Sequence, residues 1–142
     1  MKTNASLILK YLIAFLFIYA GTYKITDINL FASQMYQSPL LPGRLVPILS
    51  IFVPIFEILL GFLLIFSKLD YYLLRISLSL MIFFSTYLIM LFTLYDKPPC
   101  ACGGILNNMG YPEHIIFNIF FTILSAIAIF IYEKPSKQIL TI

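Results

Sequence analysis

Four long apolar stretches divide the chain, and each is long enough to cross a lipid bilayer as a helix. They run over about 5–22, 46–66, 71–94 and 113–132, and about 20 residues suffice for one crossing. No stretch alternates polar and apolar residues over the ~10 positions that a transmembrane strand needs. The pattern therefore predicts a bundle of four transmembrane helices.

A shorter amphipathic segment lies between the first two apolar stretches. Asp27 can cap a short helix, and Phe31 and Met35 follow it at helical spacing. Proline-containing turns over 38–43 then end the segment. We expect this short helix to lie in the outer membrane interface or to cover the outer end of the bundle.

The composition is that of an integral membrane protein. Hydrophobic residues make up 61% of the 142 residues, charged residues make up 11%, and the mean hydropathy is +0.98. We therefore expect one all-α domain over 1–142, surrounded by the lipid bilayer. The net charge of +3 is too small to indicate a nucleic-acid partner. The first stretch lacks a small-x-small cleavage site before Gly21, so we interpret it as a retained helix whose Lys10 extends toward the near interface.

The distribution of basic residues predicts the orientation. If the amino terminus is inside, six basic residues fall on the inner side and three on the outer side, which favours both termini in the cytoplasm. The loop over 95–112 then faces the extracytoplasmic side of the cell (inner) membrane, where disulfides can form. The inner set is Lys2, Lys10, Lys68, Arg75, Lys134 and Lys137, and the outer set is Lys24, Arg44 and Lys97.

The only two cysteines, Cys100 and Cys102, lie in that loop and are followed by Gly103 and Gly104. A disulfide across one intervening residue closes a small strained ring, and strained, exposed disulfides are the more oxidising and labile ones. The glycines leave the sulfur atoms open to a partner. The pattern favours thiol–disulfide exchange. Soft-metal binding and an inert pair that pins the loop are the alternatives.

His114 lies near the start of the last apolar stretch, shortly after the cysteines. Its imidazole could hydrogen-bond a thiolate or take a thiol proton. It could equally be an interfacial histidine that faces lipid headgroups. Asn118 follows one helical turn later on the same face and could orient the imidazole.

Glu57 is the one acidic residue clearly inside an apolar stretch. Such residues are costly in lipid and tend to face the bundle interior, so Glu57 could carry a proton, anchor a ligand or pair with a base from another helix. Lys24 and Arg44 are the candidate bases. However, Glu57 lies eleven residues after Val46, near mid-bilayer, and this depth predicts that neither base reaches it easily. Lys24 is expected to meet Asp27, the cysteine loop or the interface.

Four segments follow one another in a fixed order over nearly the whole chain. They are Ala20-Gly21-x-x-Lys24 with Asp27 and Phe31, Leu40-Leu41-Pro42, Pro54-x-x-Glu57 with Gly61, and Cys100-x-Cys102-Gly103-Gly104. Together they resemble the MauE/DoxX family of redox-associated membrane proteins. The resemblance implies a four-helix bundle that acts in disulfide formation or thiol transfer outside the cytoplasm. MauE itself is linked to maturation of methylamine dehydrogenase alongside a thioredoxin-like partner.

One position departs from the family pattern. MauE-type loops usually read Cys-x-Cys-Phe-Gly, whereas this chain has Gly103 in place of the aromatic residue. The departure leaves the identity of the substrate open, and a role in methylamine metabolism is not carried over to this chain.

The sequence thus predicts a membrane thiol–disulfide redox protein, with Cys100, Cys102 and His114 as catalytic residues. Lys24, Glu57, Asn118, Gly103 and Gly104 are supporting residues. Quinone-linked disulfide oxidases use two cysteine pairs, whereas this chain has one. Electrons must therefore pass to a bound cofactor, for which a quinone is a candidate, or to an extracytoplasmic protein.

A thioredoxin-fold partner would supply the second dithiol, and the chain could belong to a larger membrane complex. The alternative function is a non-enzymatic membrane subunit that docks a partner. A Cu(I) or Zn site at the cysteine loop with His114 is a further alternative.

Overall fold

The computed structural model describes residues 4–95 and 111–137, with side chains over 4–95 and 112–132. Most of the described residues are helical, and none of them lies in a strand. The helices are α1 (Asn4–Thr26), α2 (Ile28–Tyr36), α3 (Val46–Phe66), α4 (Asp70–Leu94) and α5 (Tyr111–Lys137). All except α2 are long and apolar enough to cross a membrane. The predicted all-α fold with four transmembrane helices is confirmed. α1 continues four residues beyond its predicted end, which places Lys24 on the helix.

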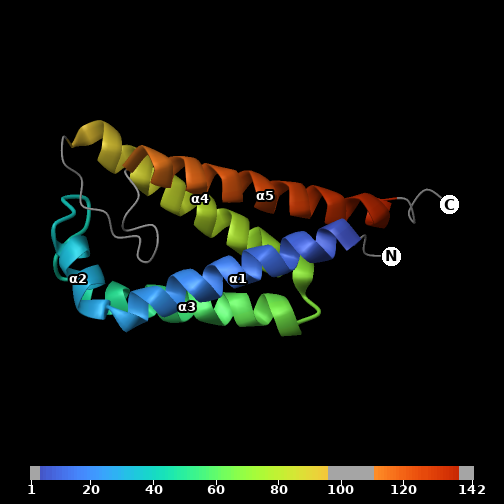
Figure 1. Cartoon of the computed structure of the whole chain (residues 1–142), viewed down its shortest axis with the longest axis horizontal. Helices are drawn as coiled ribbons and strands as arrows, with labels where there is room; N and C mark the ends of the chain where they lie inside the picture. Colours follow the sequence, from blue (N-terminus) through green and yellow to red (C-terminus); the bar gives the residue numbers. More distant parts are fainter. Residues whose placement is uncertain (1–3, 96–110, 138–142) are drawn as a thin grey trace.

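The long helices associate as two pairs, α1 with α3 and α4 with α5 (Figure 1). α1 begins and α5 ends at the same end of the bundle, and α2 lies at the opposite end (Figure 1). α3 and α4 are joined by a short turn and run antiparallel. They diverge toward the α2 end, so that the two pairs separate there (Figure 1).

Two glycines bring the backbones of α1 and α3 together. A Cβ atom on Gly21 would lie 2.7 Å from the carbonyl oxygen of Pro54, and one on Gly61 would lie 2.8 Å from that of Ala14. Neither position accepts a larger side chain without movement of the opposite helix. Small residues permit this close approach of helices in lipid.

At the end of the bundle away from α2, a buried ion pair joins α1 to α4. The Lys10 ammonium lies 3.0 Å from the carboxylate of Asp70, the first residue of α4, and both side chains are buried. The expectation that Lys10 extends toward the interface was therefore wrong. A carboxylate inside the bundle satisfies the ammonium, because charged groups in a membrane bundle pair with one another.

Apolar packing fills the bundle between this ion pair and the α2 end. Ile13 and Phe17 of α1 pack in one core with Leu64 of α3 and Leu74 of α4. Large apolar side chains are also exposed on the outer faces of the long helices, which is the arrangement expected for contact with lipid.

The short helix α2 covers the end of the bundle. The Asp27 carboxylate accepts a hydrogen bond from the Leu30 N–H at 3.3 Å, which confirms the predicted cap. Phe31 and Met35 form a second apolar cluster with Val46 at the start of α3. The structure therefore shows the expected position over the end of the bundle, and the position in the membrane interface stays a prediction.

Candidate functional site

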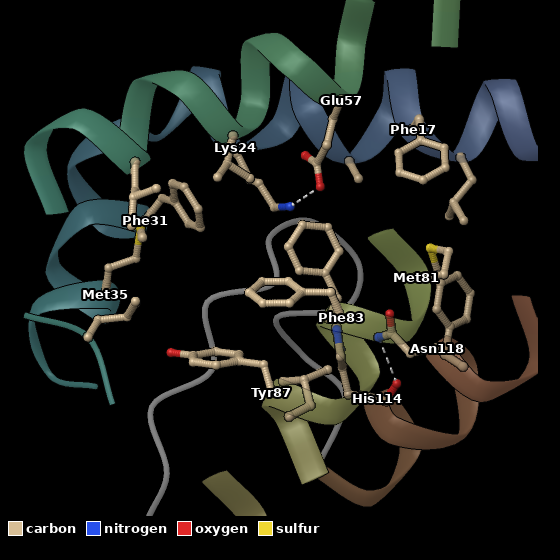
Figure 2. Close-up of a pocket in the computed structure, with 18 residues that line it drawn as sticks. Phe17, Lys24, Phe31, Met35, Glu57, Met81, Phe83, Tyr87, His114 and Asn118 are labelled. Atoms are coloured by element: carbon tan, nitrogen blue, oxygen red, sulfur yellow. Dashed lines mark hydrogen bonds and ion pairs between the residues drawn. The ribbon is translucent and has the colours of Figure 1, made fainter. Parts of the chain in front are cut away.

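A cavity of about 210 Å³ lies between the two helix pairs at the α2 end of the bundle (Figure 2). Every described helix contributes to its wall, and most of the wall is apolar or aromatic. The polar groups of the wall come from a few side chains. The lining residues are Leu16, Phe17, Ala20, Lys24, Phe31, Met35, Leu41, Leu49, Val53, Glu57, Met81, Phe83, Phe84, Tyr87, Leu88, His114, Phe117 and Asn118.

One wall of the cavity carries a buried ion pair. The Lys24 ammonium donates to Oε1 of Glu57 at 2.6 Å. Lys24 is 8% exposed and Glu57 is 3% exposed. The expectation that Lys24 does not easily reach Glu57 was therefore wrong, whereas Arg44, the other candidate base, is exposed.

The pair forms because of the close antiparallel packing of α1 and α3. Gly21 faces Pro54 and Ile58, so Lys24, three residues on, is level with about residue 53, and Glu57 lies about 6 Å deeper. Side chains on a helix lean toward its amino terminus. On antiparallel helices Lys24 and Glu57 therefore lean toward one another, and the four-carbon stem of lysine covers the remaining distance.

Two aromatic rings complete the surroundings of the Lys24 ammonium. Its nitrogen lies 5.6 Å from the ring centroid of Phe31 and 5.3 Å from that of Phe84. Both distances are within the range of cation–π attraction, which is strongest where water is excluded. The two rings come from α2 and α4, and the ion-pair partner Glu57 comes from α3, so the ammonium connects α1 with three other helices at the cavity wall.

The second oxygen of the Glu57 carboxylate has an open hydrogen-bonding capacity. Oε2 is buried and accepts no hydrogen bond from the part of the chain that the structure describes. A carboxylate accepts bonds at both oxygens, and a buried acceptor without a donor is destabilising. Glu57 lines the cavity, so this unsatisfied acceptor belongs to a residue of the cavity wall.

The opposite wall carries His114 and Asn118 from α5 (Figure 2). His114 is 2% exposed, and Asn118 is also buried. The Asn118 amide donates to the carbonyl oxygen of His114 at 3.1 Å. The prediction that both residues share a helix face is confirmed. Their roles in proton transfer and in orienting the imidazole stay predictions.

A hydroxyl pair ties α4 to the loop after α2. The Tyr87 hydroxyl donates to Oγ of Ser38 at 2.6 Å, and Ser38 is buried. The bond therefore holds the loop after α2 against α4. Tyr87 also lines the cavity. Sequence reasoning did not select Tyr87, and its only signal was a tyrosine amid the apolar residues of the third stretch.

The four loop residues predicted for the site, Cys100, Cys102, Gly103 and Gly104, lie outside the described residues. The helices on either side of their loop, α4 and α5, end and begin at the α2 end of the bundle, where the cavity lies (Figure 1). Within residues 4–95 and 112–132, no three side chains of His, Cys, Asp or Glu gather as metal ligands would.

The comparisons with known proteins identify the family. The model of the family described as "Methylamine utilisation protein MauE" matches residues 2–131. The chain therefore belongs to the MauE family of membrane proteins. No curated protein and no solved structure matches the chain.

Proposed function

From its membership of the MauE family and the position of its cavity, we propose that the protein is a membrane thiol–disulfide redox protein. Cys100 and Cys102 exchange with an extracytoplasmic partner. The observation that carries the proposal is the position of the His114 side chain. It is buried at the cavity wall in the first turns of α5, which directly follows the cysteine loop in the sequence.

The proposed orientation agrees with the arrangement of the helices. α1 begins and α5 ends at one end of the bundle, and α2 with the cavity lies at the other (Figure 1). The excess of basic residues near the first end favours the cytoplasm for that end. The cysteine loop then faces the extracytoplasmic side of the inner membrane, and 1–142 acts as one domain.

The exchange proceeds in two balanced steps. A thiolate of the partner attacks the Cys100–Cys102 disulfide, so that a mixed disulfide forms and one cysteine leaves as a thiolate. A second partner thiolate then attacks the mixed disulfide and releases the other cysteine. The partner gains a disulfide and loses two electrons, and the cysteine pair gains them. His114 receives and returns the thiol protons.

A thioredoxin-fold protein is the proposed partner. Its paired thiols match the two-step exchange, and its reactive thiolate would be accessible to a loop outside the bilayer. A larger membrane complex containing this partner is compatible with the same exchange.

The test is the redox state of Cys100 and Cys102 in intact membranes. We expect an impermeant maleimide to label the pair from outside only after mild reduction with a dithiol. The single variants Cys100→Ser and Cys102→Ser should each trap a mixed disulfide or lose exchange, and both should keep the helical fold. A pair that is reduced as isolated, or that is labelled only after the membrane is broken, would contradict the proposal. A double Cys→Ser variant that still supports its partner would instead indicate a docking subunit.

A further inference from the structure

We propose that the cavity at the α2 end binds the ring of a lipid-soluble, single-ring quinone or its quinol, which enters from the bilayer. The binding site consists of described residues alone: Lys24 and Glu57 on one wall, His114 and Asn118 on the other, and aromatic side chains between them (Figure 2).

The volume of the cavity limits the size of the ligand that it can hold. An apolar cavity of about 150 Å³ holds a benzene ring, whereas pockets for drug-sized molecules measure about 300–1,000 Å³. The volume of about 210 Å³ therefore fits one substituted ring. A longer apolar tail would have to leave the cavity and remain in the lipid.

The polar groups match both redox forms of such a ring. The Lys24 ammonium has three N–H donors, and the structure shows one of them bound to Oε1 of Glu57. A further donor can bind a quinone carbonyl. Glu57 lines the cavity, and its Oε2 is buried and accepts nothing from the described residues. A rotation of the carboxylate that turns Oε2 toward the ring would let it accept a bond from a quinol hydroxyl. An acyl chain would satisfy neither group.

The route of entry is from lipid. Phe83 lines the cavity and is nevertheless 65% exposed, so its ring stands at the boundary between the cavity and the outer face of α4. This face lies within a membrane-spanning helix. A ligand that passes Phe83 therefore comes from the hydrocarbon region, where quinones dissolve.

The role of the quinone as electron acceptor for the cysteine pair rests on the proposed function. Oxidation of the two thiols forms one S–S bond and releases two protons and two electrons. The quinone takes up both electrons and both protons and becomes the quinol. Binding of the ring, in contrast, depends only on the cavity and can be measured separately.

The binding experiment uses the absence of tryptophan from the chain. The variant Phe84→Trp places one tryptophan at the cavity wall, and Phe130→Trp places one on an exposed face of α5 as the matched control. Both proteins are titrated in detergent with decylubiquinone, a single-ring benzoquinone. We expect saturable quenching for Phe84→Trp and only a linear, unsaturated decrease for Phe130→Trp. Equal quenching of the two reporters would overturn the proposal.

Two further variants of the Phe84→Trp reporter test the chemistry. Replacing the ion pair together, as Lys24→Met with Glu57→Leu, removes the polar wall without leaving an unpaired charge, and should weaken binding about tenfold or more. Ala20→Leu fills part of the cavity and should also weaken it. Unchanged affinity in the ion-pair variant, or equal competition by a plain alkane, would show an acyl-chain groove and overturn the proposal.

A last variant separates this inference from the proposed function. The double variant Cys100→Ser/Cys102→Ser, made in the Phe84→Trp reporter, should bind decylubiquinone with unchanged affinity. If this variant binds normally while intact membranes show no reducible cysteine pair, the thiol relay is wrong and the quinone site stands. If the reporter with both cysteines present fails to bind, the quinone site is wrong whatever the cysteines do.

Discussion

The buried pair of Lys24 and Glu57 gives the sharpest prediction for stability. The change is Lys24→Met or Glu57→Leu alone, compared with both together. Each single change leaves one charge buried without its partner, which costs about 3–5 kcal/mol in proteins, whereas an apolar replacement of a whole pair is often neutral or stabilising. We therefore expect each single variant to be strongly destabilised and the double variant to recover most of the loss.

The geometry sets the size of the coupling between the two changes. Two unit charges 2.6 Å apart attract by about 6 kcal/mol at an effective dielectric constant of about 20. This attraction is offset in part because the unfolded chain in a membrane also finds polar partners, which lowers measured couplings to about 0.6–1.7 kcal/mol for hydrogen bonds between neutral groups. For a charged pair we expect a coupling of at least about 2 kcal/mol.

The assay is reversible unfolding in mixed micelles with increasing dodecyl sulfate, followed by the loss of helical circular dichroism. The matched control combines Lys24→Met with Asp70→Leu, two residues that belong to different ion pairs. Changes at sites without shared partners add within about 0.3–0.5 kcal/mol, so this control should show no coupling. If the Lys24 and Glu57 changes also add to within that range, the ion pair is not formed in the folded protein and the reasoning is refuted.

Three further predictions concern the glycine contact, the cap of α2 and the hydroxyl pair. Gly61→Ala should separate α1 from α3 and destabilise the fold. The control Gly43→Ala should be tolerated, because its Cβ atom would lie 3.7 Å from its nearest neighbour. Equal unfolding midpoints for the two variants would contradict the close contact. Asp27→Ala should cost about 1 kcal/mol through loss of the cap, and hydrogen exchange should then rise in α2 first. Tyr87→Phe removes the bond to Ser38 at 2.6 Å and should cost about 1 kcal/mol; an unchanged unfolding midpoint would show that the bond does not hold this end of the bundle.

The helices could be predicted from the sequence because lipid leaves the backbone few alternatives. A long apolar run has to satisfy its own hydrogen bonds within the bilayer, so length and hydropathy sufficed for α1, α3, α4 and α5. α2 was predictable for a different reason, since Asp27 is a strong cap and Phe31 and Met35 mark one face.

The ion pairs were not predicted, because they depend on distances between helices. Counting residues along α3 placed Glu57 out of reach of Lys24, but the count took no account of the glycine contact that brings α1 close. Lys10 was judged alone, although Asp70 is an acid at the start of a membrane-spanning helix and was available as its partner. An acid and a base at matching depths of two spans are a signal that could have been used.

The cavity could not be predicted from the sequence either. Its walls include residues from five helices, and its volume depends on the divergence of α3 and α4, which no local pattern encodes. His114, Asn118, Lys24 and Glu57 were each selected from the sequence. Their common position around one cavity is what the structure adds.

The two lysines of α1 are both buried, and their position in the first helix has a consequence for biosynthesis. Both lysines are synthesised before their partners. Glu57 follows Lys24 by 33 residues, and Asp70 follows Lys10 by 60 residues. Lysine opposes insertion of an isolated helix, and α1 has a mean hydropathy of 1.7 against 2.7 for α3. We therefore expect α3, and then α4, to strengthen the insertion of the nascent α1 by supplying the carboxylates that pair with its lysines. Membrane insertion and folding of this protein are consequently one coupled process.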